Sequence, residues 1–251
     1  MEQKRRRFGL VGKELKHSFS PTYFAQKFEQ CGINDASYEL FSFAAISDFP
    51  VWLRQQKNLV GLNVTIPYKQ AIIPYLDRLS PAAQAVGAVN TIAFRNNLLI
   101  GHNTDIWGFE QSLLACLTEQ QRASRALILG TGGAALAVSY VLQQLQIPYQ
   151  LVSRKPTAAQ LAYQQIDATI LQQHLVLINT TPLGMYPNLQ TLPELDYSAV
   201  TPHHLLFDLV YNPAVTAFLQ QGKNQGATIQ NGLPMLELQA DKAWEIWNEN
   251  T

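Results

Sequence analysis

Apolar and polar positions alternate along the first hundred residues in a way that predicts strands and helices in turn. Three short stretches have the pattern of strands: Phe8–Val11, Ser37–Phe41 and Val60–Val64. Three intervening stretches carry apolar residues at helical spacing: Pro21–Cys31, Ala44–Gln56 and Pro67–Leu76. Ser20 is placed to cap the first of these helices, with Pro21 at its first position. The alternation predicts an α/β domain.

A hairpin is predicted next, with strands Val89–Phe94 and Leu98–Gly101 joined at Asn96-Asn97 at one edge of the sheet. An amphipathic helix, Asp105–Leu117, leads away from it, and the polar stretch 119–124 indicates a domain boundary. Five more strands follow, with helical stretches between several of them: Ala126–Leu129, Tyr149–Val152, Leu175–Ile178, Leu205–Leu209 and Ala227–Ile229. This order predicts a doubly wound parallel sheet. The last predicted helix, Leu233–Trp247, has one apolar face.

The segment A-L-I-L-G-T-G-G-A-A, residues 126–135, joins a buried strand to a helix through a glycine turn. Gly130, Gly132 and Ala135 have the G-x-G-x-x-G/A spacing of dinucleotide-binding turns. The first glycine allows the tight turn, the second lets the backbone approach a pyrophosphate, and the alanine lets helix and strand pack closely. Unpaired N–H groups at the helix start favour phosphate charge. The segment therefore predicts a nucleotide site, with a purely structural turn as the alternative.

The residues after the next strand predict which dinucleotide binds. An NAD site has an acidic residue about 20 positions after the glycines, whereas an NADP site has an arginine for the 2′-phosphate. Here the strand ends in Ser153-Arg154-Lys155, and no acidic residue lies between Gly130 and Asp167. Arg154 offers a planar fork, Lys155 a second positive charge and Ser153 a hydroxyl. NADP is predicted; two solvated cations that open a loop are the alternative.

Composition narrows the function classes. With 251 residues, 47% of them hydrophobic, the chain is long enough for one large or two modest globular domains. The 18 basic and 18 acidic side chains balance, so charge gives no reason to expect nucleic acid or an anionic membrane as a partner. No apolar run approaches a transmembrane helix in length. The basic run Lys4–Arg7 is expected to be a solvated tail. No apolar segment of the kind that a signal peptide requires follows this run. A cytoplasmic protein is expected.

The two cysteines, Cys31 and Cys116, match no metal or redox spacing. Both sit among apolar residues in helical patterns, so buried reduced thiols are expected. No metal is expected.

Two polar clusters in the first hundred residues suggest chemistry. Ser18 and Ser20 could bind a carboxylate, although serine is also an ordinary N-cap. Asn63 and Thr65 share one face at the end of a strand. Lys69 is expected in the first turn of a helix, where the helix dipole disfavours a cation, so its presence there hints at a chemical role. A solvated surface lysine is the alternative.

Three further clusters extend the pattern. The first two are G-A-V-N-T, residues 87–91, and G-H-N-T-D, residues 101–105. Asp105 is also a natural N-cap for the helix that follows. The third, N-T-T-P-L-G-M at 179–185, comes at the carboxyl end of a strand, where ligands bind in open α/β sheets.

Taken together, these clusters resemble the shikimate dehydrogenase family. The motifs S-x-S-P, N-V-T-x-P-x-K, G-A-V-N-T, G-x-N-T-D-x-x-G, G-x-G-G-A, N-x-T-P-x-G-M and D-x-V-Y-N-P occur in family order from Ser18 to Pro213. The segment N-G-L-P-M-L at 231–236, with Gln239, extends the match almost to the end. The resemblance implies a substrate-binding α/β domain joined to a Rossmann-like doubly wound parallel sheet domain. It implies NADPH-dependent, reversible reduction of 3-dehydroshikimate to shikimate, in the chorismate pathway to aromatic amino acids.

The resemblance also implies roles for individual residues. It makes Lys69 and Asp105 the catalytic pair. It gives a set of substrate residues: Ser18 and Ser20 for the carboxylate, and Asn63, Thr65, Asn90, Tyr211 and Gln239 for the ring hydroxyls. It gives a set of cofactor residues: Gly130, Thr131, Gly132, Gly133, Ala134, Ser153, Arg154, Lys155, Thr180, Leu209 and Gly232. A lysine ammonium paired with a carboxylate can stabilise the negative charge on the ketone oxygen and deliver a proton, and which group is the immediate donor is left open.

Two departures from the family pattern are visible. Thr131 stands where the family has alanine, a small change that leaves the turn intact, and Ser153-Arg154-Lys155 stands where it has Asn-Arg-Thr. Because the arginine is kept, preference for NADP is expected to survive. Residues 1–104 with 233–251 are expected to form the substrate-binding domain and 105–232 the NADP-binding domain. The site is expected in the cleft between them, with open and closed states.

Three alternatives are weighed against this interpretation. The missing acidic residue after Val152 counts against an NAD-using quinate/shikimate dehydrogenase, and the paired serines and the N-T-D cluster count against methylenetetrahydrofolate dehydrogenase. The presence of both Lys69 and Asp105 counts against a non-catalytic ligand-sensing relative. The expected partner is a small-molecule substrate, with no nucleic acid and no membrane, and the protein is a monomer or a homodimer.

Overall fold

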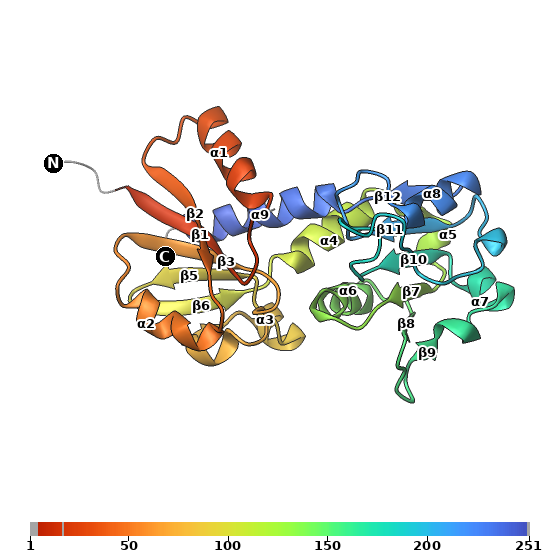
Figure 1. Ribbon diagram of the computed structural model, residues 1–251. Helices are drawn as coiled ribbons and strands as arrows, with labels where there is room; N and C mark the ends of the chain where they lie inside the picture. The colour runs from red at the N-terminus through yellow and green to blue at the C-terminus, as the bar shows by residue number, and fades with distance from the viewer. Residues whose placement is uncertain (1–4, 17, 250–251) are drawn as a thin grey trace. The chain divides into compact units, whose positions relative to one another are not determined.

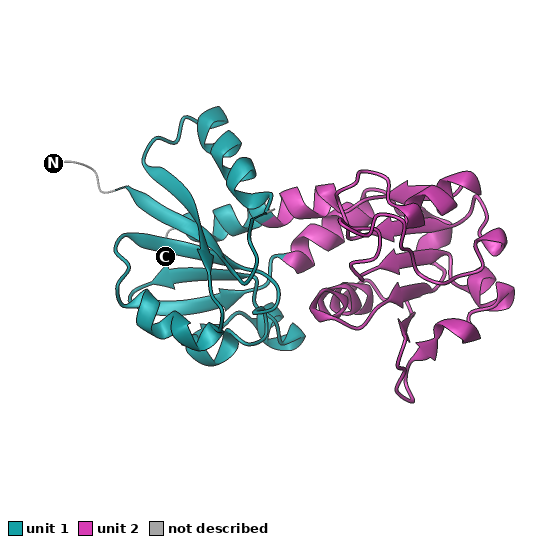
Figure 2. Cartoon of the chain, in the orientation of Figure 1, with its two compact units in different colours: residues 1–104, 240–251 teal, residues 105–239 magenta. Residues whose placement is uncertain are grey.

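The structure, a computed structural model, describes residues 5–16 and 18–249 of a mixed α/β protein (Figure 1). The chain divides into two compact units, residues 1–104 with 240–251 and residues 105–239 (Figure 2). The chain was expected to return to the first domain at residue 233. Compactness instead groups residues 233–239, the first turns of helix α9 (Leu233–Asn248), with the second unit.

The first unit is built on a six-stranded mixed sheet. Its strands in chain order are β1 (Arg6–Gly12), β2 (Ala36–Ser42), β3 (Leu59–Val64), β4 (Arg78–Leu79), β5 (Thr91–Arg95) and β6 (Leu98–His102), and their order in space is β2-β1-β3-β5-β6-β4. Strand β1 is parallel to β2 and β3, whereas β5 is antiparallel to β3 and β6. The β5–β6 hairpin confirms the prediction: Asn96 and Asn97 have φ of 49° and 64°, as a tight hairpin turn requires.

Two apolar layers cover the two faces of this sheet. One contains α1 (Ser20–Gln30) and the last turns of α9, whose Phe24 and Trp247 pack with Phe8 of β1. The other contains η1 (Ile46–Asp48), α2 (Phe49–Leu53), η2 (Ile73–Tyr75) and α3 (Pro81–Val86). Phe49 and Ile72 of that layer are fully buried against Leu62 of β3. Alternate strand residues thus feed opposite layers.

One predicted helix is shorter in the structure than expected, and another does not form. Only η1 and α2 form within 44–56, and 67–76 is a series of turns that ends in η2. Pro50 and Pro74 fall inside the two predicted helices and lack the N–H that a continuous helix needs. The backbone oxygen of Lys69 accepts from Val89 N at 2.7 Å, so a tertiary partner replaces the helical one.

The second unit confirms the doubly wound parallel sheet. Its strands are β7 (Ala126–Leu129), β8 (Tyr149–Ser153), β9 (Leu161–Ala162), β10 (Val176–Asn179), β11 (Leu205–Asp208) and β12 (Thr228–Gln230). All neighbours are parallel and the order is β12-β11-β10-β7-β8-β9, which is the 3-2-1-4-5-6 order of dinucleotide-binding folds. The topology reverses between β7 and β10, where such folds bind their ligands.

Side chains of β7 alternate between the two helical layers of this unit. Ala126 and Ile128 pack with α4 (Asp105–Leu114), α6 (Gly133–Gln144) and the start of α9. Leu127 and Leu129 pack with α7 (Ala168–Gln173) and α8 (Ala217–Asn224). The remaining short elements are α5 (Glu119–Arg122), η3 (Tyr163–Gln165) and η4 (Tyr197–Ala199). Because both sheet faces are covered, the strands consist of near-continuous apolar residues.

The described part of the basic run is not a solvated tail. Arg6 and Arg7 lie in β1 and form ion pairs with Asp35 at 2.8 Å and with Glu39 at 2.7 Å. Lys4 lies outside the described residues. The guanidinium of Arg7 lowers the pKa of Glu39 through a hydrogen bond. These pairs connect β1 to β2 and to the turn before it.

Both cysteines are free thiols, and the expectation that both are buried was wrong for Cys31, which is exposed at the end of α1. Cys116 is half-buried, and burial raises the pKa of its thiol to about 11. No helix among residues 5–16 and 18–249 combines the length and apolar character that membrane crossing requires.

Candidate active site

The glycine turn of the second unit has the predicted geometry. Gly130 follows β7 with φ of +115°, and a Cβ there would lie 2.7 Å from Thr180 Oγ1, so only glycine is accommodated. Gly132 caps α6 without a side-chain hydrogen bond, and a Cβ on Gly132 or Gly133 would meet nothing within 4 Å. Open space therefore lies above backbone N–H groups at the start of a twelve-residue helix. This arrangement suits a pyrophosphate.

The residues predicted to select NADP follow β8, the strand next to β7. Ser153 ends β8, its Oγ accepts from Lys155 N at 3.1 Å, and Arg154 and Lys155 are exposed. Strand β8 is parallel to β7, so these side chains and the glycine turn emerge at the same end of the sheet. A planar guanidinium at that position fits the 2′-phosphate of NADP.

The paired serines lie at the start of α1 in the first unit. The helix begins at Ser20 and its N-cap position is Phe19, so the predicted capping role of Ser20 was wrong. Ser18 Oγ instead accepts from Ser20 N at 3.3 Å. Ser20 also interacts with the hydroxyl of Tyr38, whose pKa burial raises far above its usual value. Both serine hydroxyls are half-buried at one helix start, a disposition that suits a carboxylate.

A buried hydrogen-bond cluster joins Asn63 and Asn90. Tyr38 donates to Asn63 Oδ1 at 2.7 Å, and Asn63 Nδ2 donates to Thr91 Oγ1 at 3.2 Å and to Asn90 O at 3.3 Å. Asn90 Nδ2 donates to Thr104 Oγ1 at 3.0 Å, and Asn90 Oδ1 accepts from Thr104 N at 2.7 Å. Thr104 directly precedes Asp105, so Asn90 holds the backbone that leads to this residue. The cluster presents amide and hydroxyl groups of the kind that bind ring hydroxyls.

Thr65 and Lys69 lie in the turns after β3. Thr65 N donates to Val11 O at 2.9 Å, and Tyr68 donates through its hydroxyl to Phe43 O at 2.7 Å. Since residues 67–76 form no α-helix, the dipole argument for Lys69 does not hold. The catalytic role of Lys69 is therefore supported only by the family resemblance. Lys69 belongs to the first unit and Asp105 begins the second, so their pairing stays a prediction.

Asp105 is the first residue of α4 and is 8% exposed. In the same unit, Gln239 lies on α9, where its Nε2 donates to Leu236 O at 2.8 Å. A Cβ on Gly108, one turn after Asp105, would lie 3.1 Å from Gln239 Cβ. Asp105 and Gln239 are therefore carried by two helices in direct backbone contact.

Asp208 organises the carboxyl ends of β10 and β11, a role that the sequence analysis missed. Its carboxylate accepts from Asn179 Nδ2 at 2.9 Å, from Val210 N at 3.0 Å and from Thr216 Oγ1 at 2.5 Å. Asn179 in turn accepts from Thr181 Oγ1 at 2.6 Å. Burial raises the pKa of Asp208 to about 6, although these donors favour the charged form. The only available signal was its place at the head of the D-x-V-Y-N-P motif.

Three predicted cofactor and substrate residues lie near Asp208 in the chain or against its neighbours. Leu209 and Tyr211 follow Asp208 in sequence, and Gly232 lies against the backbone of Leu209. Leu209 N donates to Asn179 O at 3.0 Å, and Gly232 N donates to Val210 O at 3.1 Å. A Cβ on Gly232 would lie 2.2 Å from Leu209 O, so glycine is required where β12 ends against this segment. Tyr211 is half-buried, and burial raises the pKa of its hydroxyl. Thr180 Oγ1 donates to Leu129 O at 2.9 Å. This bond connects the end of β10 to the end of β7, where the glycine turn begins.

Replacing Asp208 with asparagine is expected to change how stability depends on pH. The folded-state pKa near 6 exceeds the usual value of 3.8, so the proton binds the folded state more tightly. This contribution to the free energy of unfolding is complete below pH 4 and is lost as pH rises through about 6. Between pH 7 and pH 4 the wild type should therefore gain on the order of 2 kcal/mol relative to Asp208→Asn. Urea unfolding at a series of pH values measures the free energy of unfolding of both proteins. If this free energy depends on pH in the same way in both, the raised pKa of Asp208 is contradicted.

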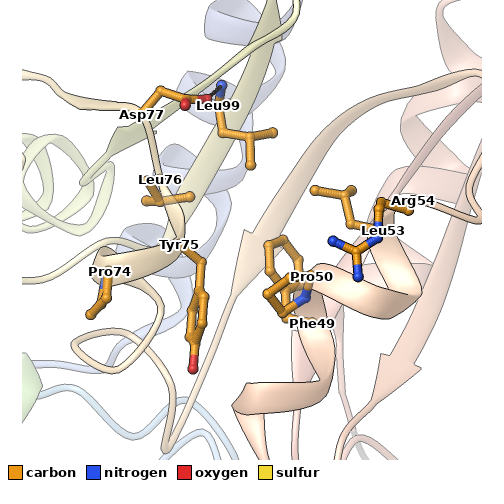
Figure 3. A pocket seen from close by; sticks show the side chains of 9 residues that line it. All are labelled: Phe49, Pro50, Leu53, Arg54, Pro74, Tyr75, Leu76, Asp77 and Leu99. Carbon is orange, nitrogen blue, oxygen red and sulfur yellow. Dashed lines mark hydrogen bonds between the residues drawn. The ribbon is translucent and has the colours of Figure 1, made fainter.

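A surface cavity of about 360 Å³ lies in the first unit (Figure 3). Side chains of α2 and of the η2 segment line it, among them Phe49, Leu53 and Tyr75. Its one carboxylate, on Asp77, accepts from Leu99 N at 2.7 Å. None of the predicted site residues lines it. Within residues 5–16 and 18–249, no group of three or more His, Cys, Asp or Glu side chains could hold a metal ion.

Sequence reasoning missed the hydroxyl groups that hold the two asparagines. Thr91 and Thr104 lie within the clusters G-A-V-N-T and G-H-N-T-D, and Tyr38 lies in no motif. The alternation of Ser37–Phe41 predicted the strand that carries Tyr38, but no local signal indicates that its hydroxyl meets Asn63.

Comparisons with known proteins identify the family that this chain resembles over almost its whole length. Residues 10–92 match the family model described as the shikimate dehydrogenase substrate binding domain. The shikimate dehydrogenase (NADP(+)) of Desulforamulus reducens is 36% identical over 267 residues, covering 95% of this chain and 88% of that protein.

Solved structures show the same fold over nearly the whole chain. The shikimate dehydrogenase of Aquifex aeolicus has a TM-score of 0.86 and 30% identity, covering 99% of this chain and 94% of that one. The Thermus thermophilus enzyme, solved in complex with NADP(H) and shikimate, has a TM-score of 0.85 and 32% identity, covering 97% of this chain and 93% of that one.

Proposed function

Because this chain belongs to the shikimate dehydrogenase family, we propose that it catalyses the reversible NADPH-dependent reduction of 3-dehydroshikimate to shikimate. The observation that carries the proposal is the buried cluster of Asn63, Asn90 and Thr104 in the first unit. Residues far apart in sequence form one set of amide and hydroxyl groups there, immediately before Asp105. Amide and hydroxyl groups of this kind can bind the hydroxyls of a polyhydroxylated ring. Their place directly before Asp105 would bring that ring close to the carboxylate proposed to act on it.

The proposed chemistry divides between two sets of side chains. NADPH, when bound, supplies hydride. The Lys69 ammonium, paired with the Asp105 carboxylate, stabilises the negative charge on the ketone oxygen, and the pair delivers a proton to that oxygen. Ser18 and Ser20 hold the substrate carboxylate, and the ring hydroxyls are bound by the remaining residues: Asn63, Thr65, Asn90, Tyr211 and Gln239. The domain of residues 1–104 with 233–251 binds substrate and 105–232 binds the cofactor.

The cofactor proposal uses the glycine turn and the residues after β8. Backbone groups of residues 130–134 hold the pyrophosphate, and Thr180, Leu209 and Gly232 lie at the neighbouring strand ends where the nicotinamide half is expected. Ser153, Arg154 and Lys155 hold the 2′-phosphate. The small-molecule reaction needs no macromolecular partner, and we propose a cytoplasmic monomer or homodimer; light scattering of the purified protein distinguishes the two assemblies.

The direct test is oxidation of NADPH and of NADH by the purified protein, with 3-dehydroshikimate and 3-dehydroquinate offered in turn. Turnover of 3-dehydroshikimate with NADPH is expected. Absence of turnover with either cofactor would refute the proposed function, and preference for NADH would favour the NAD-using quinate/shikimate relative.

Replacing Arg154 with alanine is expected to raise KM for NADPH by about tenfold or more, because a charge-assisted contact to the 2′-phosphate is lost. KM for NADH should change little, since NADH lacks that phosphate. Arg125→Ala is the matched control, because Arg125 is also exposed but precedes β7 at the opposite end of the sheet. Equal losses for both cofactors would contradict the phosphate role of Arg154.

A further inference from the structure

Helix α4 approaches the backbone of α9 closely at Gly108. A Cβ at this position would lie 2.5 Å from Met235 O and 3.1 Å from both Gln239 N and Gln239 Cβ. Met235 O belongs to the helical backbone of α9, so it cannot turn aside as a side chain does. Ordinary contact begins at 3.4 Å, so an added methyl group would force the two helices apart by about 1 Å.

This contact lies on the face of α4 that carries Asp105. Positions i and i+3 of a helix are neighbours, so Asp105 and Gly108 share one face. Both are buried, and the next residue, Phe109, packs edge-on against Phe207 at 5.2 Å between ring centroids. Phe109 and Met235 belong to the same apolar core. Helix α4 is thus held against the sheet through Phe109, while α9 lies against the backbone of α4 at Gly108.

Gln239 lies on the α9 side of the same contact. Its Nε2 donates to Leu236 O at 2.8 Å, so its side chain is held along its own helix. Its amide therefore follows any movement of the α9 backbone. The position of Gln239 relative to Asp105 depends on how closely the two helices approach.

We infer that Gly108 is a positioning residue, whose missing side chain sets the distance between Asp105 and Gln239. The inference rests on the proposed function, in which Asp105 acts on the substrate and Gln239 binds its ring. Gly108 touches no substrate in this account and acts through α9. A displacement of about 1 Å at a substrate-holding group is enough to lower catalytic efficiency by 10- to 100-fold.

Gly108→Ala is the direct test, with shikimate oxidation by NADP⁺ as the assay. We expect kcat/KM for shikimate to fall by about 10- to 100-fold while KM for NADP⁺ changes by less than about twofold. Gly222→Ala is the matched control: a Cβ there would lie 2.6 Å from Leu206 Cδ2, so it disturbs the core of the same unit on the other face of the sheet. It should lower Tm and leave KM for shikimate unchanged. An equal loss of kcat/KM in both variants would mean general loosening and overturn the inference.

A double-mutant cycle with Gln239→Ala separates a positioning role from a structural one. If Gly108 acts through Gln239, Gly108→Ala should reduce kcat/KM by less than about threefold in the Gln239→Ala background. Full additivity of the two losses would overturn the inference.

Gln239→Asn keeps the test open if Gly108→Ala does not fold. The shorter side chain withdraws the amide, and α9 cannot advance because it already contacts α4, so KM for shikimate should rise at least about tenfold. An unchanged KM would show that the α9 backbone is not held and would overturn the inference. Inactive wild-type protein would instead refute the proposed function, and the inference with it, whereas active wild type with an unaffected Gly108→Ala variant refutes the inference alone.

Discussion

Lys69→Ala is expected to lower kcat by about 10²-fold or more, with KM for 3-dehydroshikimate much less affected. The lost ammonium is the group proposed to stabilise the negative charge on the ketone oxygen, and together with Asp105 it forms the pair that delivers the proton; both effects are needed mainly in the transition state. The variant should fold normally. Lys69 is held through its backbone oxygen, which accepts from Val89 N, and Tyr68 anchors the same turn to Phe43 O.

Steady-state kinetics at saturating NADPH measures this effect, and Tm checks the fold. Lys57→Ala is the matched control, because Lys57 is an exposed lysine of the same unit just before β3. Lys69→Arg distinguishes charge from proton delivery: a guanidinium keeps the charge but does not release a proton readily. An unchanged kcat in Lys69→Ala would remove Lys69 from the mechanism.

Trp247→Ala is expected to lower the free energy of unfolding by about 3–5 kcal/mol. Trp247 is 2% exposed, with its ring centroid 5.0 Å from that of Phe8 and 5.6 Å from that of Phe24. Its Nε1 donates to Ile92 O at 3.1 Å, and this acceptor would lose its side-chain partner in the variant. The indole lies so close to β3 that a Cβ on Gly61 would be 2.2 Å from the ring.

Urea unfolding followed by near-ultraviolet circular dichroism measures this loss. Glu245→Ala serves as the control on the same helix, because the Glu245 side chain is 59% exposed and contributes only a surface ion pair with Lys242. Its effect should stay within about 0.5 kcal/mol. A loss below about 1 kcal/mol for Trp247→Ala would contradict the anchoring role of the indole. Gly61→Ala should also destabilise, by about 1–3 kcal/mol, since it overfills the same contact.

The elements predicted well from the sequence are those with strong local signals. Ala126–Leu129 is a strand with the predicted bounds, because a strand covered on both faces is a continuous apolar run that ends at a glycine turn. The Asn96-Asn97 hairpin was found because both residues tolerate positive φ. The helix expected over 67–76 failed because Lys69 O and the Tyr68 hydroxyl bond to residues distant in sequence, and local propensity contains no information about those partners.

The sequence by itself determined the fold class, the glycine turn, the arginine after β8 and the family, because each depends on residue type at fixed local spacing. Tertiary structure alone decided which polar groups meet. Tyr38 bonds to Asn63, Asn90 holds Thr104, and Asn179 donates to Asp208. The sequence separation of these partners follows no rule. The contact of Gly108 with α9 is of the same kind: a missing Cβ has a consequence only where another backbone lies against it. A hydrogen bond or a steric contact needs two partners, and the local sequence around one residue does not identify the distant residue that will meet it in the folded protein.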